Sequence, residues 1–208
     1  MAASAKGVKN KKVKGEPMIS GQSPDGQEKF VCFYGDTDPF SNFCPSPFTL
    51  GGKEFTCTEQ YFQYMKAVIF DDDDTQAAIL AEPNPGVQKK LGRQVKNYDV
   101  ELWNNVSADH MKEGCLAKFE QNPELQEILL NSAGSTIVEA SPRDTKWGIG
   151  FGKRNPLCFD RSKWRGENRL GTVLMEVREI LLQRKQEANG KSSSPDSEVI
   201  APSDSKGS

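Results

Sequence analysis

The sequence predicts a compact single α+β domain, mainly α, with five or six helices and a few short strands. Its length of 208 residues suits one domain. Apolar side chains recur at helical spacing in several segments, whereas strand-like apolar runs are few and short. Both ends are poor in apolar residues. We therefore expect a disordered basic tail at 1–28, the folded domain at 29–185 and a second disordered tail at 186–208.

The predicted domain begins with a strand at 29–34, which is a continuous apolar run. A turn-rich segment follows at 35–47, where phenylalanines alternate with proline and polar residues. We interpret these aromatic side chains as anchors of the loop on the core, and contact with a ligand is the alternative. Residues 49–55, with Gly51 and Gly52 at their centre, predict a short hairpin.

The first predicted helix spans 59–69 and has one broad apolar face. Glu59, Gln63 and Lys66 form a narrow polar stripe on the opposite side. Because Thr56 to Glu59 matches the capping-box pattern, Glu59 is either a capping acid or a functional carboxylate that projects into a cleft. Glu59 and Lys66 are too far apart for a simple intrahelical bond, so another group must lie between or above them.

The elements after this helix follow from caps and periodicity. The four aspartates at 71–74 are interpreted as a solvated acidic loop. The last helix opens at Asn168 or its neighbour and carries apolar residues at i, i+3, i+4 and i+7. Four elements lie between: a helix beginning at Pro85 after the N-cap Asn84, a helix over 100–118 that can break near Ser107, a helix beginning at Pro123 that Gly134 can end, and a strand over 135–140.

The composition argues against several kinds of site. His110 is the only histidine, which disfavours Ser-His-Asp triads, Cys-His pairs and multi-histidine metal sites. The five cysteines have no metal-site spacing, so we expect reduced thiols, no metal and no cofactor in a cytoplasmic or nuclear protein. No apolar run reaches the roughly 20 residues that a membrane span needs. The net charge of −2 gives no general attraction to nucleic acid, and the basic run at 9–14 is either a nuclear address, a weak nucleic-acid tether or a solvated tail.

A second candidate site lies in the glycine-rich segment 144–153. Glycines beside Trp147 let the backbone approach a flat ligand while the indole stacks on it. The alternative is a core tryptophan in a turn. On local sequence alone, Trp103 and Trp164 are better explained by core packing.

Taken in chain order, these motifs resemble those of the YbiA/NADAR family over about 31–182. Gln60 stands where histidine is commoner in the family, and the segment 153–165 is longer and more basic than the usual glycine-rich link. We expect this segment to alter substrate entry or to reach toward a phosphate chain. The matching positions are Phe40-Ser41-Asn42-Phe43, Pro47-Phe48, Thr56 to Gln63 with Lys66, Gly92-Arg93, Trp103, Lys118 to Leu125, Glu139, Asp144, Trp147-Gly148, Gly166, Asn168 to Gly171 and Leu174-Met175.

The resemblance implies an N-glycosidase on a mainly helical fold. Members resemble enzymes that hydrolyse ribosylamino-pyrimidine phosphates, which are riboflavin-synthesis intermediates, or enzymes that remove ADP-ribose from guanine, including guanine in nucleic acid. It implies Glu59, Asp144 and Lys66 as catalytic residues, with Lys66 either pairing with a carboxylate or forming a Schiff base with the opened sugar. The substrate-binding residues that we assign are Asn42, Gln63, Arg93, Trp103, Trp147 and Asn168.

A protein of a different class remains as the alternative. A non-catalytic module that binds ADP-ribose or a nucleotide needs stacking and phosphate contacts, but it does not need a full acid-base set. The presence of Glu59, Asp144 and Lys66 together favours the enzyme. The sequence gives no indication of the oligomeric state.

Overall fold

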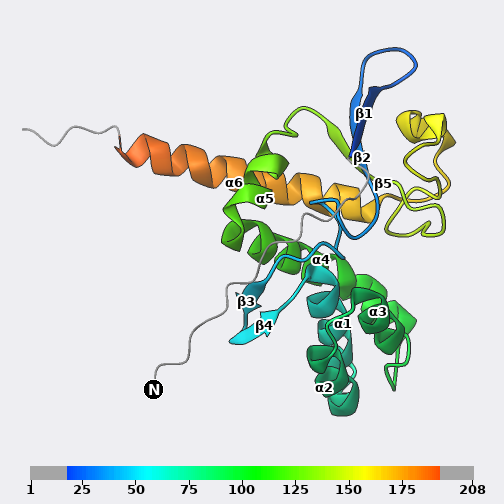
Figure 1. Cartoon of the computed structure of the whole chain (residues 1–208), viewed down its shortest axis with the longest axis vertical. Coiled ribbons are helices and arrows are strands. Elements are labelled where there is room, and N and C mark those ends of the chain that lie inside the picture. Colours follow the sequence, from blue (N-terminus) through cyan, green and yellow to red (C-terminus); the bar gives the residue numbers. More distant parts are fainter. Residues whose placement is uncertain (1–17, 193–208) are drawn as a thin grey trace, which may run out of the picture.

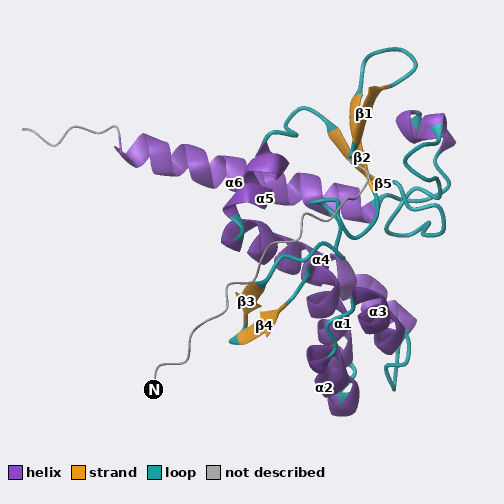
Figure 2. Ribbon diagram, in the orientation of Figure 1, coloured by secondary structure: helices purple, strands orange, loops and turns teal. Residues whose placement is uncertain are grey.

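The computed structural model describes residues 18–192, which form six α-helices and five short strands (Figures 1 and 2). The predicted α+β class with a majority of helix is confirmed. The elements in chain order are β1 (Ile19–Gln22), β2 (Lys29–Phe33), β3 (Phe48–Leu50), β4 (Lys53–Phe55), α1 (Thr58–Ile69), α2 (Asp73–Ala81), α3 (Pro85–Gly92), α4 (Val100–Gln121), α5 (Pro123–Leu130), β5 (Thr136–Glu139), the 3-10 helices η1 (Pro156–Phe159) and η2 (Arg161–Lys163), and α6 (Arg169–Ser192).

A three-stranded sheet in the order β1-β2-β5 separates two apolar clusters. Strand β2 pairs antiparallel with β1 and parallel with β5. Because side chains alternate along a strand, Phe33 and Ile137 face the large helical core, while Phe30, Cys32 and Val138 face a smaller cluster. The smaller cluster is closed by the segment that carries η1 and η2.

The helices pack in an order that places α4 at the centre. Helix α4 contacts α6 on one side and α1 on the other, and α1 in turn packs against α2 and α3 (Figure 1). Helix α4 runs unbroken through Ser107, which is fully buried, so the predicted break at that position is wrong. Helix α5 ends at Leu130, before Gly134. Asn84 accepts hydrogen bonds from the backbone amides of Gly86 and Val87, which confirms the predicted cap of α3.

The acidic segment 71–74 is more than a solvated loop, and this interpretation is corrected. Asp72 is buried and caps the unpredicted helix α2 by accepting a hydrogen bond from the backbone amide of Thr75 at 3.2 Å. It also accepts a bond from the backbone amide of Lys96 at 2.9 Å. Helix α2 buries only Ile79 fully, so its sequence carries almost no apolar periodicity that could reveal it.

Secondary structure extends beyond both predicted domain boundaries. Residues 19–22 fall in the predicted tail 1–28, yet they form β1, whose Ile19 lies opposite Cys32. Backbone pairing with the edge of β2 holds this strand, and such pairing needs few apolar side chains. Helix α6 continues past residue 185 to Ser192 through residues that are mostly good helix formers. The remaining parts of the predicted tails, 1–17 and 193–208, lie outside the described residues.

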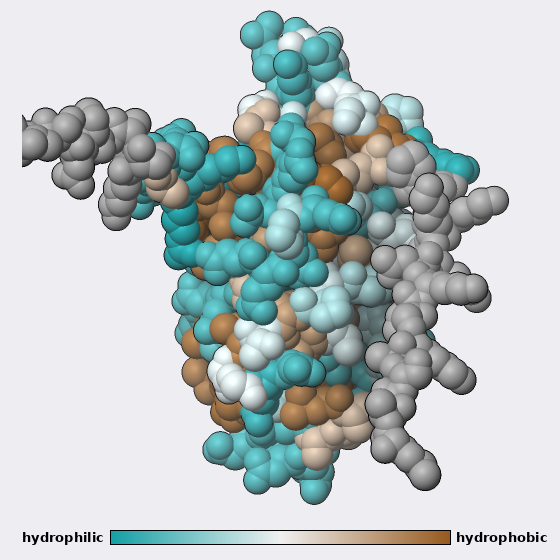
Figure 3. Space-filling model, turned by 60° about the vertical axis from the view of Figure 1, so that its left-hand side comes forward, coloured by the Kyte–Doolittle hydropathy of each residue, from teal (hydrophilic) through white to brown (hydrophobic). Residues whose placement is uncertain are grey.

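The surface of the described part has no extended apolar face in the view of Figure 3. Apolar patches there are interrupted by hydrophilic side chains. The exposed large apolar side chains are scattered, and Val100 is the most exposed of them. Between residues 18 and 192, no helix combines the length and the apolar character that a membrane crossing requires.

Candidate active site

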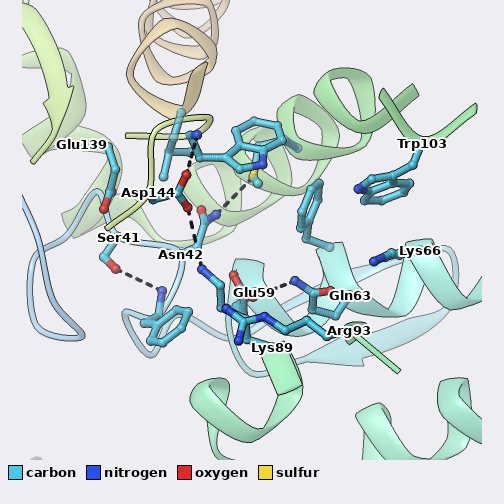
Figure 4. A pocket seen from close by; sticks show the side chains of 15 residues that line it. Ser41, Asn42, Glu59, Gln63, Lys66, Lys89, Arg93, Trp103, Glu139 and Asp144 are labelled. Atoms are coloured by element: carbon cyan, nitrogen blue, oxygen red, sulfur yellow. Dashed lines mark hydrogen bonds and ion pairs between the residues drawn. The ribbon is translucent and has the colours of Figure 1, made fainter. Parts of the chain in front are cut away.

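A cavity of about 190 Å³ lies where α1, α3, α4 and the ends of β5 and α6 converge (Figure 4). The loop 41–43 and the segment after β5 complete its wall. Eight of the nine predicted site residues line it, although they are dispersed over more than 100 positions of the chain. They are Asn42, Glu59, Gln63, Lys66, Arg93, Trp103, Asp144 and Trp147.

Glu59 projects into this cavity and does not cap its helix. The N-cap residue of α1 is Cys57, and its side chain makes no capping bond. The capping-box hydrogen bond predicted for Glu59 is made by the next residue instead: Oε1 of Gln60 accepts from the backbone amide of Thr56 at 2.7 Å. The carboxylate of Glu59 is 4% exposed and accepts a hydrogen bond from Nε2 of Gln63 at 2.8 Å. The capping alternative for Glu59 is therefore wrong.

The surroundings of Glu59 set a balance between its charged and neutral forms. Burial raises the pKa of Glu59, and nearby Asp144 raises it further. Lys89 and the hydrogen bond from Gln63 act in the opposite direction. Glu59 is thus a carboxyl group with little water around it, held beside a cation (Figure 4).

Asp144 fixes the turn that carries one wall of the cavity. Its Oδ1 accepts hydrogen bonds from the backbone amides of Trp147 at 2.8 Å and Lys146 at 3.0 Å. Its Oδ2 lies 3.9 Å from Nζ of Lys89 on α3. These contacts place Asp144 to orient Trp147 and Lys89.

Three aromatic side chains form a flat-sided wall. The ring of Phe62 lies 5.0 Å from that of Trp103 and 5.3 Å from that of Trp147, measured between centroids. His110 stacks on Trp103 at 6.4 Å and is not among the residues that line the cavity. Trp164 packs in the smaller cluster and donates to the carbonyl of Cys158, which confirms its predicted core role.

Lys66 forms no ion pair with a carboxylate among residues 18–192, so that predicted role is not supported. Its Nζ donates to the carbonyl oxygen of Gly92 at 2.8 Å and lies 3.9 Å from the ring centroid of Tyr98. Burial lowers the pKa of Lys66, and the positive charges of Lys146 and Arg93 lower it further. A Schiff-base amine needs a shift in this direction.

The two predicted asparagines have different places. Asn42 lines the cavity, and its buried Oδ1 has no hydrogen-bond partner in the described structure. Asn168 is not among the residues that line the cavity. Its side chain accepts from the backbone amide of Glu139 at 2.9 Å and donates to the carbonyl of Ile137 at 2.9 Å, which ties the start of α6 to β5. The predicted contact of Asn168 with substrate is therefore replaced by a structural role.

Sequence reasoning missed two charged residues of the cavity, Lys89 and Glu139. Lys89 carried no local signal, because a lysine near the end of a helix is usually solvated. Glu139 had a signal, because it is among the positions that match the family motifs, but no role in the site was assigned to it. Burial, followed by the charge of Asp144, raises the pKa of Glu139 to about 8. Within residues 18–192, no cluster of three or more His, Cys, Asp or Glu side chains is arranged to hold a metal ion.

The sequence model of the NADAR domain family matches residues 32–182 of the chain. The chain belongs to the NADAR family. It is 42% identical to protein irg-1 of Caenorhabditis elegans over 79% of this chain and 85% of the relative. It is 37% identical to N-glycosidase R617 of Acanthamoeba polyphaga mimivirus over 73% of this chain and 96% of the relative.

A relative of solved structure has a similar fold. The NMR structure of the Escherichia coli protein YbiA superposes with a TM-score of 0.63 at 34% identity, covering 76% of this chain and 88% of that one. The curated E. coli relative carries the name N-glycosidase YbiA. The predicted family is confirmed by these similarities.

Proposed function

We propose that this NADAR-family chain is an N-glycosidase that hydrolyses the bond between a nitrogenous base and C1′ of a ribose phosphate or ADP-ribose. The observation that carries the proposal is the buried carboxylate of Glu59 in a cavity with indole walls. The names of the mimiviral and E. coli relatives agree with this reaction class.

The chemistry follows from the charge that develops as the bond breaks. Cleavage gives the ribose oxocarbenium character, which a carboxylate in a dry site stabilises strongly. Glu59 has this position and can take a proton from the attacking water, while Gln63 holds its carboxylate in place. Asp144 acts as an orienting group, because both of its oxygens are engaged by Trp147, Lys146 and Lys89.

The remaining lining residues suit the other parts of such a substrate. The indoles of Trp103 and Trp147 offer flat surfaces for the base. Arg93 and Lys89 supply positive charge for phosphate. The unpaired Oδ1 of Asn42 is available to a hydroxyl or amino donor of the substrate. These features fit ribosylamino-pyrimidine phosphates and ADP-ribosylated guanine alike, since both present a base, a ribose and phosphate.

Lys66 is proposed as the nucleophile of a covalent route. Its amine would attack C1′ of the opened sugar to give a Schiff base, which water then hydrolyses. The lowered pKa and the lack of a carboxylate partner within the described residues support this role over an ion pair.

The deciding experiment is incubation of the purified full chain with each candidate substrate, with free base and free sugar phosphate measured by chromatography and mass spectrometry. We expect stoichiometric release of both products from at least one candidate. Binding of ADP-ribose or nucleotide without release of base from any candidate would instead identify a non-catalytic binding module. The same assay discriminates between the two substrate classes.

A further inference from the structure

We propose that Glu139 is the general acid that protonates the departing base, a role that rests on the proposed N-glycosidase function. Glu139 is absent from the site predicted by sequence, and it lines the cavity from a different element than Glu59. A base nitrogen is a poor leaving group as an anion, so bond cleavage needs a proton donor on the base side.

The backbone of Glu139 is held on both sides, which fixes where its side chain points. It is the last residue of β5, where it pairs in parallel with Phe33 of β2. Its amide donates to Oδ1 of Asn168 at 2.9 Å, and its carbonyl accepts from the amide of Ile149 at 3.0 Å. The carboxyl group lies on the same side of the cavity as Asp144 (Figure 4). A group held by rigid strand contacts meets the positional requirement for proton transfer.

Four charged groups face Glu139; the three carboxylates among them favour its neutral form, and the lysine opposes them. These are Asp144 from the segment after β5, Lys89 from α3, Asp38 from the loop after β2 and Glu59 from α1. Lys89 is the one cation of this group, and it lies beside Asp144 at 3.9 Å. Within residues 18–192, no cation forms an ion pair with Glu139, and no hydrogen bond to its carboxyl group is found.

Glu59 and Glu139 therefore have unlike environments. Glu59 accepts a hydrogen bond from Gln63, which stabilises its charged form. Glu139 has no such donor, and its pKa of about 8 leaves most of it protonated at neutral pH. Two carboxyl groups that line one cavity, of which only Glu59 has a hydrogen-bond donor that stabilises its charged form, can serve as base and acid in the same reaction.

The bond between C1′ and the base nitrogen breaks, and its electron pair stays on the nitrogen, which takes the proton from Glu139. The oxygen of a water molecule, or the Lys66 amine in the covalent route, bonds to C1′. The proton lost by that nucleophile passes to Glu59, and a proton returns from Glu59 to Glu139 through solvent. With water as the nucleophile, the products are the neutral base, which now carries an N–H, and the free sugar. In the covalent route the sugar first remains bonded to Lys66, opens to the Schiff base, and is released with the free amine when water hydrolyses that bond.

The test compares Glu139→Gln, which removes the proton donor, with Glu139→Asp, which keeps one. The control is Glu54→Gln, which changes an exposed carboxylate on β4 outside the cavity. We expect Glu139→Gln to lower kcat roughly 10²- to 10⁴-fold, the range for loss of a general acid. We expect kcat/KM of the wild type to decline above about pH 8 as Glu139 loses its proton, and Glu139→Gln should abolish this decline. Glu139→Asp should retain part of the activity and an alkaline limb, which is the decline of kcat/KM at high pH.

Two outcomes overturn the proposal. One is a Glu139→Gln enzyme whose kcat is within a few-fold of the wild type. The other is a pH profile in that variant that keeps the wild-type alkaline limb, which would indicate a structural role. If Glu139→Gln fails to fold, a Glu139→Asp enzyme with no alkaline limb also overturns it. Failure of the proposed function is a different result, because the wild type itself would then release no base.

Discussion

The substitution Glu59→Gln tests the central feature of the site with a minimal change in shape. Glutamine keeps the length of the side chain, and its amide oxygen can still accept the hydrogen bond from Nε2 of Gln63. What is lost is the negative charge. The cavity walls, including Trp103 and Trp147, stay in place, so the variant separates charge from geometry.

The expected loss follows from the burial of this charge. Because Glu59 is 4% exposed, bulk water screens it weakly. A carboxylate about 4 Å from a developing oxocarbenium charge, at an effective dielectric constant of about 20, contributes about 4 kcal/mol. At about 1.4 kcal/mol for each factor of ten, this corresponds to roughly 10³ in kcat. Substrate binding should change by less than about threefold, since the ground state lacks that positive charge.

The assay is release of free base under single-turnover conditions, with substrate binding measured separately by calorimetry. Glu54→Gln serves as the matched control because it removes a charge from exposed β4. Thermal unfolding checks the fold, and we expect Glu59→Gln to melt no lower than the wild type, because a buried carboxylate costs stability. Near-normal turnover in a folded Glu59→Gln enzyme would refute the assignment of Glu59.

Three further predictions concern neighbouring groups. Borohydride should trap a covalent sugar adduct on the wild type but not on a Lys66→Met variant, and absence of the wild-type adduct would eliminate the Schiff-base route. Gly92→Ala should destabilise the fold by about 1–3 kcal/mol and lower activity, since its Cβ would lie 1.8 Å from Oε1 of Gln63. Gly152→Ala, whose Cβ meets nothing within 4 Å, is the control, and equal effects in urea unfolding would contradict the argument. The folded-state pKa of Glu139 is raised from 4.5 to about 8, so its neutral form stabilises the fold at low pH. The wild type should therefore lose stability relative to Glu139→Gln across that range as pH rises, by at most about 1.4 kcal/mol per pH unit, and parallel urea curves would disprove the shift.

Much of the architecture could be predicted from local sequence. Local signals predicted three helices that the structure contains. They are the apolar faces of α1 and α6 and, for α3, the N-cap Asn84 followed by Pro85 at the first helical position. Helix α2 was missed because its stability comes from the cap by Asp72 and from packing against α1. Strand β1 was missed because it is held by backbone pairing with β2, and backbone pairing leaves no periodic pattern in the sequence.

The sequence alone determined the family motifs and the identity of most cavity residues, including Glu59 and Trp147. It left the role of each residue open. Only the tertiary structure decided that Glu59 projects into the cavity, that Asn168 supports β5 and that Glu139 belongs to the site. The physical reason is that periodicity and caps are encoded within a few residues, whereas burial and the field at a carboxyl group depend on elements brought together from distant parts of the chain.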